Sequence, residues 1–449
     1  MHHRDLGVLS FVTIAALGVL SACGTTSTSN TSGGAGGLAS CHGTVSVATD
    51  LPLTGGDSTD GPFPAYGAQL AVTQANSNHT LGGCTLKYIS KDDSSVLKNG
   101  HDPAQGVANI TALAADSSVM GVVGPFNSSV ALAEIPVASQ DHLPLISPAN
   151  TNPGLTKVGT NPLIDTASLY KNGVRSYFRV ISTDDVQGKM LAYIATHELN
   201  LKKAYVFDDQ EIYGVGISVA FKQSFAADGG TVVGTASLPG STTTFSTQMS
   251  DAKSKVADLV FFGGLSGTGA GLARRDMGTA GLTSVKEMGG DGLVDTKFIT
   301  DANSGANTHA AEGVEATSAP DVTKLSSAGS FFSQYAAAYA SLPAPYNDGK
   351  KEPYTAYGYD AMNVLISAIK AAITNNGGQL PSDTMGFRDA VLAQLHKVSY
   401  DGATGHVAFD QNGDVPAPFT FTHYKVSGGA WTAVETLVED ASGNISVKS

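Results

Sequence analysis

The segment HLPLISPANTNPGLT, residues 142–156, changes character near its middle. Its first part is a short apolar run, the pattern of a buried parallel strand. Pro148 and Pro153 then interrupt regular structure, because each lacks an N–H donor and restrains the residue before it. The segment therefore predicts a strand followed by a loop rich in hydroxyl and amide groups. Open α/β sheets bind ligands at this end of their strands.

Short β-branched runs alternate with longer helical segments on both sides of this loop. Such alternation predicts βαβ units and mostly parallel sheets. A second series begins after YFRVIST, residues 177–183, so we expect an α/β chain with two doubly wound, Rossmann-like lobes. The predicted strands are TVSVATD (44–50), TLKYIS (85–90), VMGVVGP (119–125) and LPLIS (143–147), then KAYVFDD (203–209), TVVGTAS (231–237), DLVFFGG (258–264), VKEMGG (285–290) and GVEATSA (313–319).

The carboxyl-terminal part of the chain has a different pattern. Residues 352–376 place aromatic and aliphatic side chains at helical spacing and end at NNGG, which predicts one long helix. Residues 405–437 alternate apolar and polar side chains and contain NG and GG turn signals. This alternation predicts antiparallel strands.

Composition narrows the classes of protein. The chain has 449 residues, of which 42% are hydrophobic and 14% charged, values typical of a folded globular protein. Lys and Arg number 26 against 39 Asp and Glu, and the net charge is -13. A nucleic-acid-binding protein usually carries the opposite sign in a concentrated patch, so we expect no nucleic-acid partner.

The amino terminus indicates export. Residues 1–23, MHHRDLGVLSFVTIAALGVLSAC, combine a basic start with an apolar run that is too short for a transmembrane helix of about 20 residues. LSAC resembles the lipobox of bacterial lipoproteins, which implies a signal peptide over residues 1–22 and lipidation of Cys23. The Ser/Thr/Gly-rich residues that follow, to residue 40, predict a flexible tether. A plain secretory signal or a buried first helix are the alternatives.

The other two cysteines can pair. Cys41 and Cys84 each precede a predicted strand, and adjacent parallel pairing of those strands would bring the two sulfurs together. An exported protein tends to oxidise such thiols, so we expect a disulfide, with two free buried thiols as the alternative.

Enzyme and cofactor motifs are weak in this sequence. LVFFGGLSGTGAGLARR, residues 259–275, contains neither GxGxxG nor GK[ST], and Thr268 stands where a GxSxG motif needs its second glycine. His197 lacks the second histidine of a zinc helix, and the 11 histidines show no ligand spacing. We expect no catalytic residues, no cofactor and no metal.

A binding-loop pattern is clearer. In GVVGPFNSSVALAEIPV, residues 121–137, a strand leads through Asn127 and Ser128 into an alanine-rich helix. Both residues are good N-caps, and a helix start offers unpaired N–H groups that bind anions such as carboxylates. Ordinary capping is the alternative. SPANT, residues 147–151, is a second polar loop that follows the next strand, and we expect it to converge on the same place, which favours a binding role over capping alone.

These segments together resemble the leucine/isoleucine/valine-binding protein family, the type I periplasmic substrate-binding proteins of ABC importers. The resemblance implies two α/β lobes joined by a three-crossover hinge, with the ligand held between them. It implies a first lobe of residues 41–182 and about 318–395, and a second of residues 183–317 and about 396–449. The matching segments are residues 124–156, 177–195, 206–216, 261–267 and 287–293.

The resemblance also assigns roles around the ligand's α-amino acid head. Ser128, Ala149 and Thr151 match the residues that hold the carboxylate, by hydroxyl and backbone N–H groups. Asp291 falls where the family has a carboxylate for the α-ammonium, usually a glutamate. Tyr213 matches a tyrosine of the cleft wall.

Three further positions concern the ligand's side chain, and one concerns the hinge. Leu265 replaces an aromatic residue with a hydroxyl, and Asp60, with Phe63 nearby, stands where the family places an aromatic. An acidic group is costly beside an aliphatic ligand, so these residues decide which ligand is bound. Asp184 lies at the first hinge crossing.

We therefore expect a lipid-anchored, extracytoplasmic solute-binding protein, monomeric and without enzyme activity. It would capture a small amino acid, branched-chain or a related zwitterion, and deliver it to the permease subunits of an ABC transporter. The alternatives are a ligand-sensing receptor or regulator of the same fold, and a binding protein for an amide or small carboxylate. A secreted hydrolase would need a nucleophile or metal set that the sequence does not show.

Overall fold

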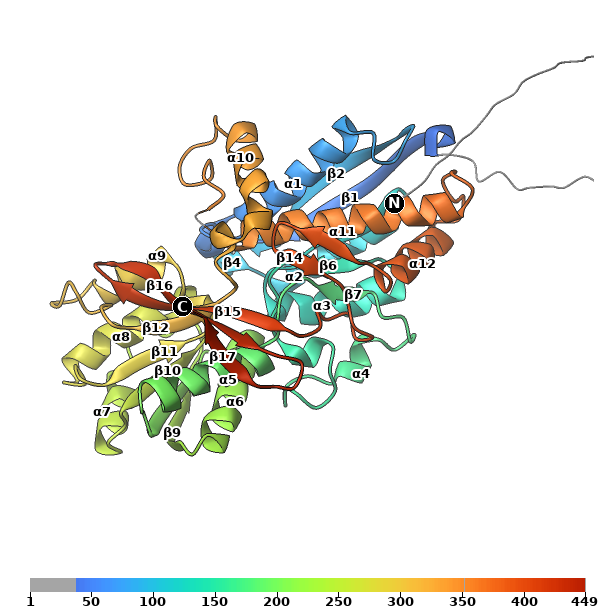
Figure 1. Cartoon of the computed structure of the whole chain (residues 1–449). Helices are drawn as coiled ribbons and strands as arrows, with labels where there is room; N and C mark the ends of the chain where they lie inside the picture. Colours follow the sequence, from blue (N-terminus) through green and yellow to red (C-terminus); the bar gives the residue numbers. More distant parts are fainter. Residues whose placement is uncertain (1–37, 351, 449) are drawn as a thin grey trace, which may run out of the picture. The chain divides into compact units, whose positions relative to one another are not determined.

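The computed structural model describes residues 38–350 and 352–448 (Figure 1). The predicted signal peptide, the lipidation site Cys23 and the tether up to residue 37 lie outside the described residues and stay predictions. Within the described ranges, no helix has the length and apolar character needed to cross a membrane.

The first sheet is parallel, with strand order β2-β1-β5-β6-β7. One face packs against α1, α11 and α12, and the other against α2 and α3. Both faces are therefore covered, which explains why β5, β6 and β7 are buried along their whole length. The elements are β1 Gly43–Leu51, α1 Pro62–Ser77, β2 Cys84–Asp92, α2 Pro103–Ala115, β5 Val119–Val123, α3 Ser128–Gln140, β6 Leu145–Ser147, β7 Tyr177–Arg179, α11 Tyr354–Asn375 and α12 Thr384–Leu395.

The second sheet has the order β17-β16-β15-β12-β11-β10-β8-β9. Its strands from β8 to β12 are parallel, and β15 to β17 add an antiparallel edge. Helices α5 and α6 pack on one face and α7, α8 and α9 on the other. The elements are α5 Asp184–Tyr193, β8 Lys203–Asp208, α6 Ile212–Ala227, β9 Thr231–Ser237, α7 Ser246–Ser254, β10 Leu259–Gly263, α8 Ala270–Thr279, β11 Lys286–Gly289, α9 Thr296–Ala302, β12 Glu315–Ser318, β15 Phe419–Ser427, β16 Ala430–Glu439 and β17 Ile445–Lys448.

The chain crosses three times between the two sheets. The colours of Figure 1, which run along the sequence, let the reader trace these crossings. The crossings lie between β7 and α5, between β12 and α10 (Gly329–Ala338), and between β14 (Gly405–Val407) and β15. The predicted α/β fold with two doubly wound sheets and a three-crossover hinge is confirmed.

The last of these crossings bears on the predicted division into lobes. Strands β13 (Tyr400–Gly402) and β14 form a hairpin, and Ala403 and Val407 share a core with α11 of the first sheet. The assignment of residues from about 396 to the second lobe stays a prediction. The remaining short strands and α-helix among the described residues are β3 Ser94–Ser95, β4 Gly100–His101 and α4 Thr166–Leu169.

A disulfide joins Cys41 to Cys84, as the sequence predicts. It forms because β1 and β2 are parallel neighbours in a register that pairs Gly43 with Cys84. The bond closes a loop of 43 residues around α1.

Candidate ligand-binding cavity

A cavity lies where the carboxyl ends of strands from both sheets meet. From the first sheet it is lined by the start of α3 and by the loop after β6, and from the second sheet by α6 and the loops after β10 and β11. Seven residues predicted from the sequence line it: Asp60, Ser128, Ala149, Thr151, Tyr213, Leu265 and Asp291. The structure thus brings together residues far apart in the chain. Their roles toward a ligand stay predictions.

The start of α3 presents unpaired polar groups to the cavity. Asn127 is the N-cap residue, yet its side chain makes no capping hydrogen bond. Its Oδ1 is buried without a hydrogen-bond partner among the described residues. A buried polar atom in this state costs about 1–3 kcal/mol. The first N–H groups of the helix also lack intrahelical partners, so a ligand with an anionic group can satisfy them.

The loop after β6 is held against the preceding strand end. Ser147 Oγ donates to the Pro125 carbonyl oxygen at 2.7 Å and accepts from the N–H groups of Asn150, at 2.8 Å, and Ala149, at 3.2 Å. The Ala149 N–H therefore already has a partner. Gly124, just before Pro125, lies close to β1: its φ is 143°, and a Cβ there would lie 2.1 Å from the Asp50 carbonyl oxygen.

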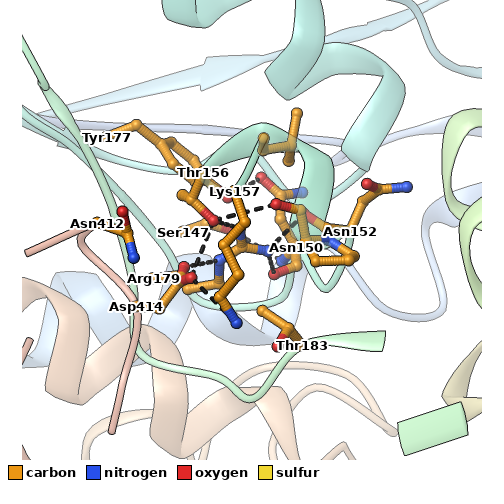
Figure 2. A network of polar contacts seen from close by, with 12 residues as sticks. Ser147, Asn150, Asn152, Thr156, Lys157, Tyr177, Arg179, Thr183, Asn412 and Asp414 are labelled. Carbon is orange, nitrogen blue, oxygen red and sulfur yellow. Dashed lines mark hydrogen bonds and ion pairs between the residues drawn. The ribbon is translucent and has the colours of Figure 1, made fainter. Parts of the chain in front are cut away.

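A fully buried arginine, Arg179, also holds the loop after β6 by hydrogen bonds to its backbone (Figure 2). Arg179 Nη1 donates to the carbonyl oxygens of Asn150, at 3.0 Å, and Asn152, at 2.9 Å, which flank Thr151. Its Nε donates to Asp414 Oδ1 at 2.7 Å and its Nη2 to Thr156 Oγ1 at 2.8 Å. This network was not predicted from the sequence. An arginine within the apolar run YFRVI was the available signal, because a buried charge needs a partner.

Asp291 lies opposite, on the second sheet, and two tyrosines donate to it. Tyr213 Oη lies 2.9 Å from Oδ1, and Tyr354 Oη donates to Oδ2. Gly290 allows this arrangement, because a Cβ there would lie 2.5 Å from Tyr213 Oη. Tyr354 belongs to α11 and was not predicted from the sequence as a site residue.

The hydrogen bonds act on how these groups ionise. Burial raises the pKa of Asp291, and the hydrogen bonds from Tyr354 and Tyr213 oppose that rise. Burial and the charge of Asp291 raise the pKa of each tyrosine well above 10. Both phenols therefore stay protonated and remain donors. The arrangement holds a carboxylate ready for a cationic group.

Asp184, the predicted hinge residue, is buried at the start of α5 and does not line the cavity. Its backbone N–H donates to the Thr151 carbonyl oxygen at 2.8 Å, which links the first crossing to the loop after β6. Burial and the nearby charge of Asp291 raise the pKa of its carboxyl group well above the usual range.

Of the three residues predicted to contact the ligand's side chain, two line the cavity. Asp60 and Leu265 line the cavity, but Phe63 does not. The Phe63 ring is buried in α1 and packs on Tyr346 with 5.5 Å between ring centroids. Four acidic residues that were not predicted from the sequence also line the cavity: Asp57, Glu211, Asp295 and Glu352.

The sequence is similar to known binding proteins. The profile of the family described as "Periplasmic binding protein" matches residues 44–430. A Leu/Ile/Val-binding protein of Rhizobium johnstonii is 29% identical over 395 residues, which is 88% of this chain and 95% of that protein.

Solved structures resemble the chain over most of its length. A leucine-binding protein of Thermotoga maritima is 26% identical, with a TM-score of 0.68, and the match covers 87% of this chain and 98% of that one. A solute-binding protein of an ABC transporter from R. palustris, solved with benzoate, is 21% identical, with a TM-score of 0.65, and covers 87% and 95%. The second likeness shows the fold alone.

Proposed function

The chain belongs to the periplasmic binding protein family, and from that premise we propose that it is an extracytoplasmic solute-binding protein. It captures a small amino acid or a related zwitterion between its two lobes. No bond is made or broken. Its work is capture, movement of the lobes around the ligand, and presentation of the complex to a membrane partner.

The position of Asp291 opposite the start of α3 carries this proposal. In the ligand complex, Ser128, Thr151 and the unpaired N–H groups of α3 hold the carboxylate of the ligand. Asp291 accepts from the α-ammonium, and Tyr213 and Tyr354 keep it oriented. The start of α3 favours an anion and Asp291 favours a cation. Together they match the two charges of an amino acid.

The membrane partner is the permease of an ABC importer, and a lipid on Cys23 keeps the protein near it. The first 40 residues support this anchor by their export signal and their tether-like composition. A diacylated cysteine provides more than one acyl chain, which stable membrane anchoring requires. The named relatives are binding proteins, which supports a role without catalysis.

A ligand without an ammonium group, such as an amide or a small carboxylate, is the second candidate. The benzoate complex of a protein with this fold favours it. Such a ligand would use the start of α3 and leave Asp291 without a cationic partner.

Thermal unfolding of the chain in the presence of single amino acids, amides and small carboxylates tests the proposal. A ligand at 100 times its dissociation constant stabilises by about 2.7 kcal/mol. We expect amino acids to raise the melting temperature and Asp291→Ala to abolish that rise, while the exposed control Asp228→Ala keeps it. Stabilisation by amides or aromatic acids alone, or amino-acid binding that survives in Asp291→Ala, would contradict the proposal.

A further inference from the structure

The candidate cavity carries a large excess of acidic groups. Among the described residues that line it are six carboxylates and no lysine or arginine. His101 is the one lining side chain in this part of the chain that can become a cation near neutral pH. The carboxylates belong to Asp57, Asp60, Glu211, Asp291, Asp295 and Glu352.

Two of these carboxylates are already accounted for. His101 Nδ1 lies 2.9 Å from Asp57 Oδ2, and the His101 backbone N–H donates to the same oxygen at 2.7 Å. This pairing raises the pKa of His101 against the effect of its burial and lowers that of Asp57. Asp291 is the proposed partner of the ligand's α-ammonium.

Three of the others come from separate parts of the chain and line the same cavity. Asp60 precedes α1, Asp295 is the N-cap of α9, and Glu352 precedes α11. We call these three residues the acidic wall. Burial raises the pKa of Asp60, and the charge of Asp295 raises it further. Burial and the charge of Asp60 do the same to Glu352.

Among the described residues, no lysine, arginine or histidine forms an ion pair with the wall, although the nearby charge of Lys297, which is paired with Asp301, acts on Asp295. Asp295 accepts hydrogen bonds from the Ser266 hydroxyl and, at 2.8 Å, from the Phe298 N–H. Glu352 accepts a long bond of 3.4 Å from the Tyr354 N–H. Carboxylates that are withdrawn from water and close together are costly unless a cation or a proton joins them.

We propose that the acidic wall binds a second positive charge, so that the ligand is an amino acid whose side chain ends in an ammonium, guanidinium or amidinium group. This inference rests on the proposed function and narrows it. An aliphatic side chain would leave the wall desolvated and unpaired. A cationic side chain would instead form charge-assisted hydrogen bonds with it, while Leu265 packs on the methylene stem.

Calorimetric titration of the full chain with L-arginine, L-lysine, L-leucine and agmatine tests this inference. Agmatine is arginine without its carboxylate, so it separates the wall from the carboxylate site. We expect arginine or lysine to bind about tenfold or more tighter than leucine, the factor of one charge-assisted hydrogen bond. Agmatine should bind more weakly than arginine.

Two isosteric variants examine the wall itself. Glu352→Gln and Asp60→Asn should each weaken binding of the basic amino acid about tenfold and leave leucine binding unchanged or improved. Asp228→Asn, an exposed change outside the cavity, should alter neither. Both wall variants remove an acidic group from the cavity, and urea unfolding checks that they fold. If one variant does not fold, the affinities of the wild-type chain for the four ligands still test the inference.

The possible failures are distinguishable. Leucine binding as tightly as arginine and lysine would overturn the acidic wall and leave the proposed function standing. Absence of binding by all three amino acids at millimolar concentration would overturn the proposed function itself. Agmatine binding as tightly as arginine would support the wall and overturn the carboxylate site at α3.

Discussion

The Arg179 guanidinium and the Asp414 carboxylate form an ion pair, with 2.7 Å between Nε and Oδ1 and both side chains buried (Figure 2). Arg179 ends β7, and Asp414 lies in the third crossing between the sheets. Asp414→Asn leaves the arginine charge buried without its partner. We expect the free energy of unfolding to fall by about 3–5 kcal/mol, measured by urea denaturation.

A half-exposed pair serves as the control for this variant. Lys297 and Asp301 form an i,i+4 pair on α9, and Asp301→Asn should change the free energy of unfolding by about 0.5 kcal/mol or less. Because Arg179 also holds the carbonyl oxygens on both sides of Thr151, Asp414→Asn should weaken ligand binding as well. Equal stability losses in the two variants would argue against a structural role for the Arg179 pair.

The Cys41–Cys84 disulfide should stabilise the chain mainly by restricting its unfolded state. Its loop of 43 residues predicts about 4 kcal/mol by the chain-entropy estimate. We expect the double variant Cys41→Ser and Cys84→Ser to melt at a lower temperature than the oxidised wild type. Reductant should lower the melting temperature of the wild type and leave that of the double variant unchanged. An unchanged melting temperature of the wild type in reductant would contradict a stabilising role of the disulfide.

Much of the fold was predictable because its signals are local. The prolines after Leu145–Ser147 end a strand, and the positions of Cys41 and Cys84 ahead of two neighbouring strands predict their pairing. The acidic wall and the arginine network were not predictable in this way. Asp414 lies 235 residues from Arg179, and no local pattern encodes such a contact.

The direction of a side chain was the other limit. Phe63 and Asp60 are close in sequence, and both were expected beside the ligand. Helix α1 turns Phe63 toward Tyr346, so only Asp60 reaches the cavity. Glu352 and Tyr354 precede and begin a helix that the sequence predicts well, but its pattern gives no sign that this end meets Asp291.

A pair of buried acids, Asp50 on β1 and Glu134 on α3, should make stability depend on pH. Asp50 and Glu134 are fully buried beside each other, and Asp50 Oδ1 accepts from Asn109 Nδ2 at 2.8 Å. Burial raises the pKa of Asp50 from 3.8 to about 7, and burial with the Asp50 charge raises that of Glu134 well above 4.5. At pH values between the ordinary and the raised pKa of these groups, the folded chain binds more protons than the unfolded chain. Its free energy of unfolding from this pair therefore falls as the pH rises from about 4 through about 7.

Glu134→Gln isolates this effect, because it keeps the shape and removes one titrating group. We expect the variant to gain stability relative to wild type as the pH rises from 5 to 8, by up to about 1.4 kcal/mol per pH unit for each proton. Urea denaturation at several pH values measures the difference. A difference that does not change with pH would refute the proposed titration of the pair.

Tyr354 should set the strength and the pH range of amino-acid binding through Asp291. Its hydroxyl donates to Asp291 Oδ2, while Tyr213 donates to Oδ1. Tyr354→Phe removes one donor, so the pKa of Asp291 rises further and its ionised form is less favoured. We expect amino-acid affinity to fall about tenfold at neutral pH, the value of one hydrogen bond to a charged group.

The pH profile separates this role from a general loss of packing. As the pH falls, protonation of Asp291 removes the partner of the α-ammonium, so affinity declines, and in Tyr354→Phe the decline should begin at a higher pH. Tyr359→Phe is the matched control, because its hydroxyl lies on the same helix and donates to Gln74 Oε1 at 2.7 Å, outside the cavity. Calorimetry from pH 5 to pH 8 follows both variants. An equal loss in the two, or an unshifted profile in Tyr354→Phe, would show that the Tyr354 hydroxyl does not act through Asp291.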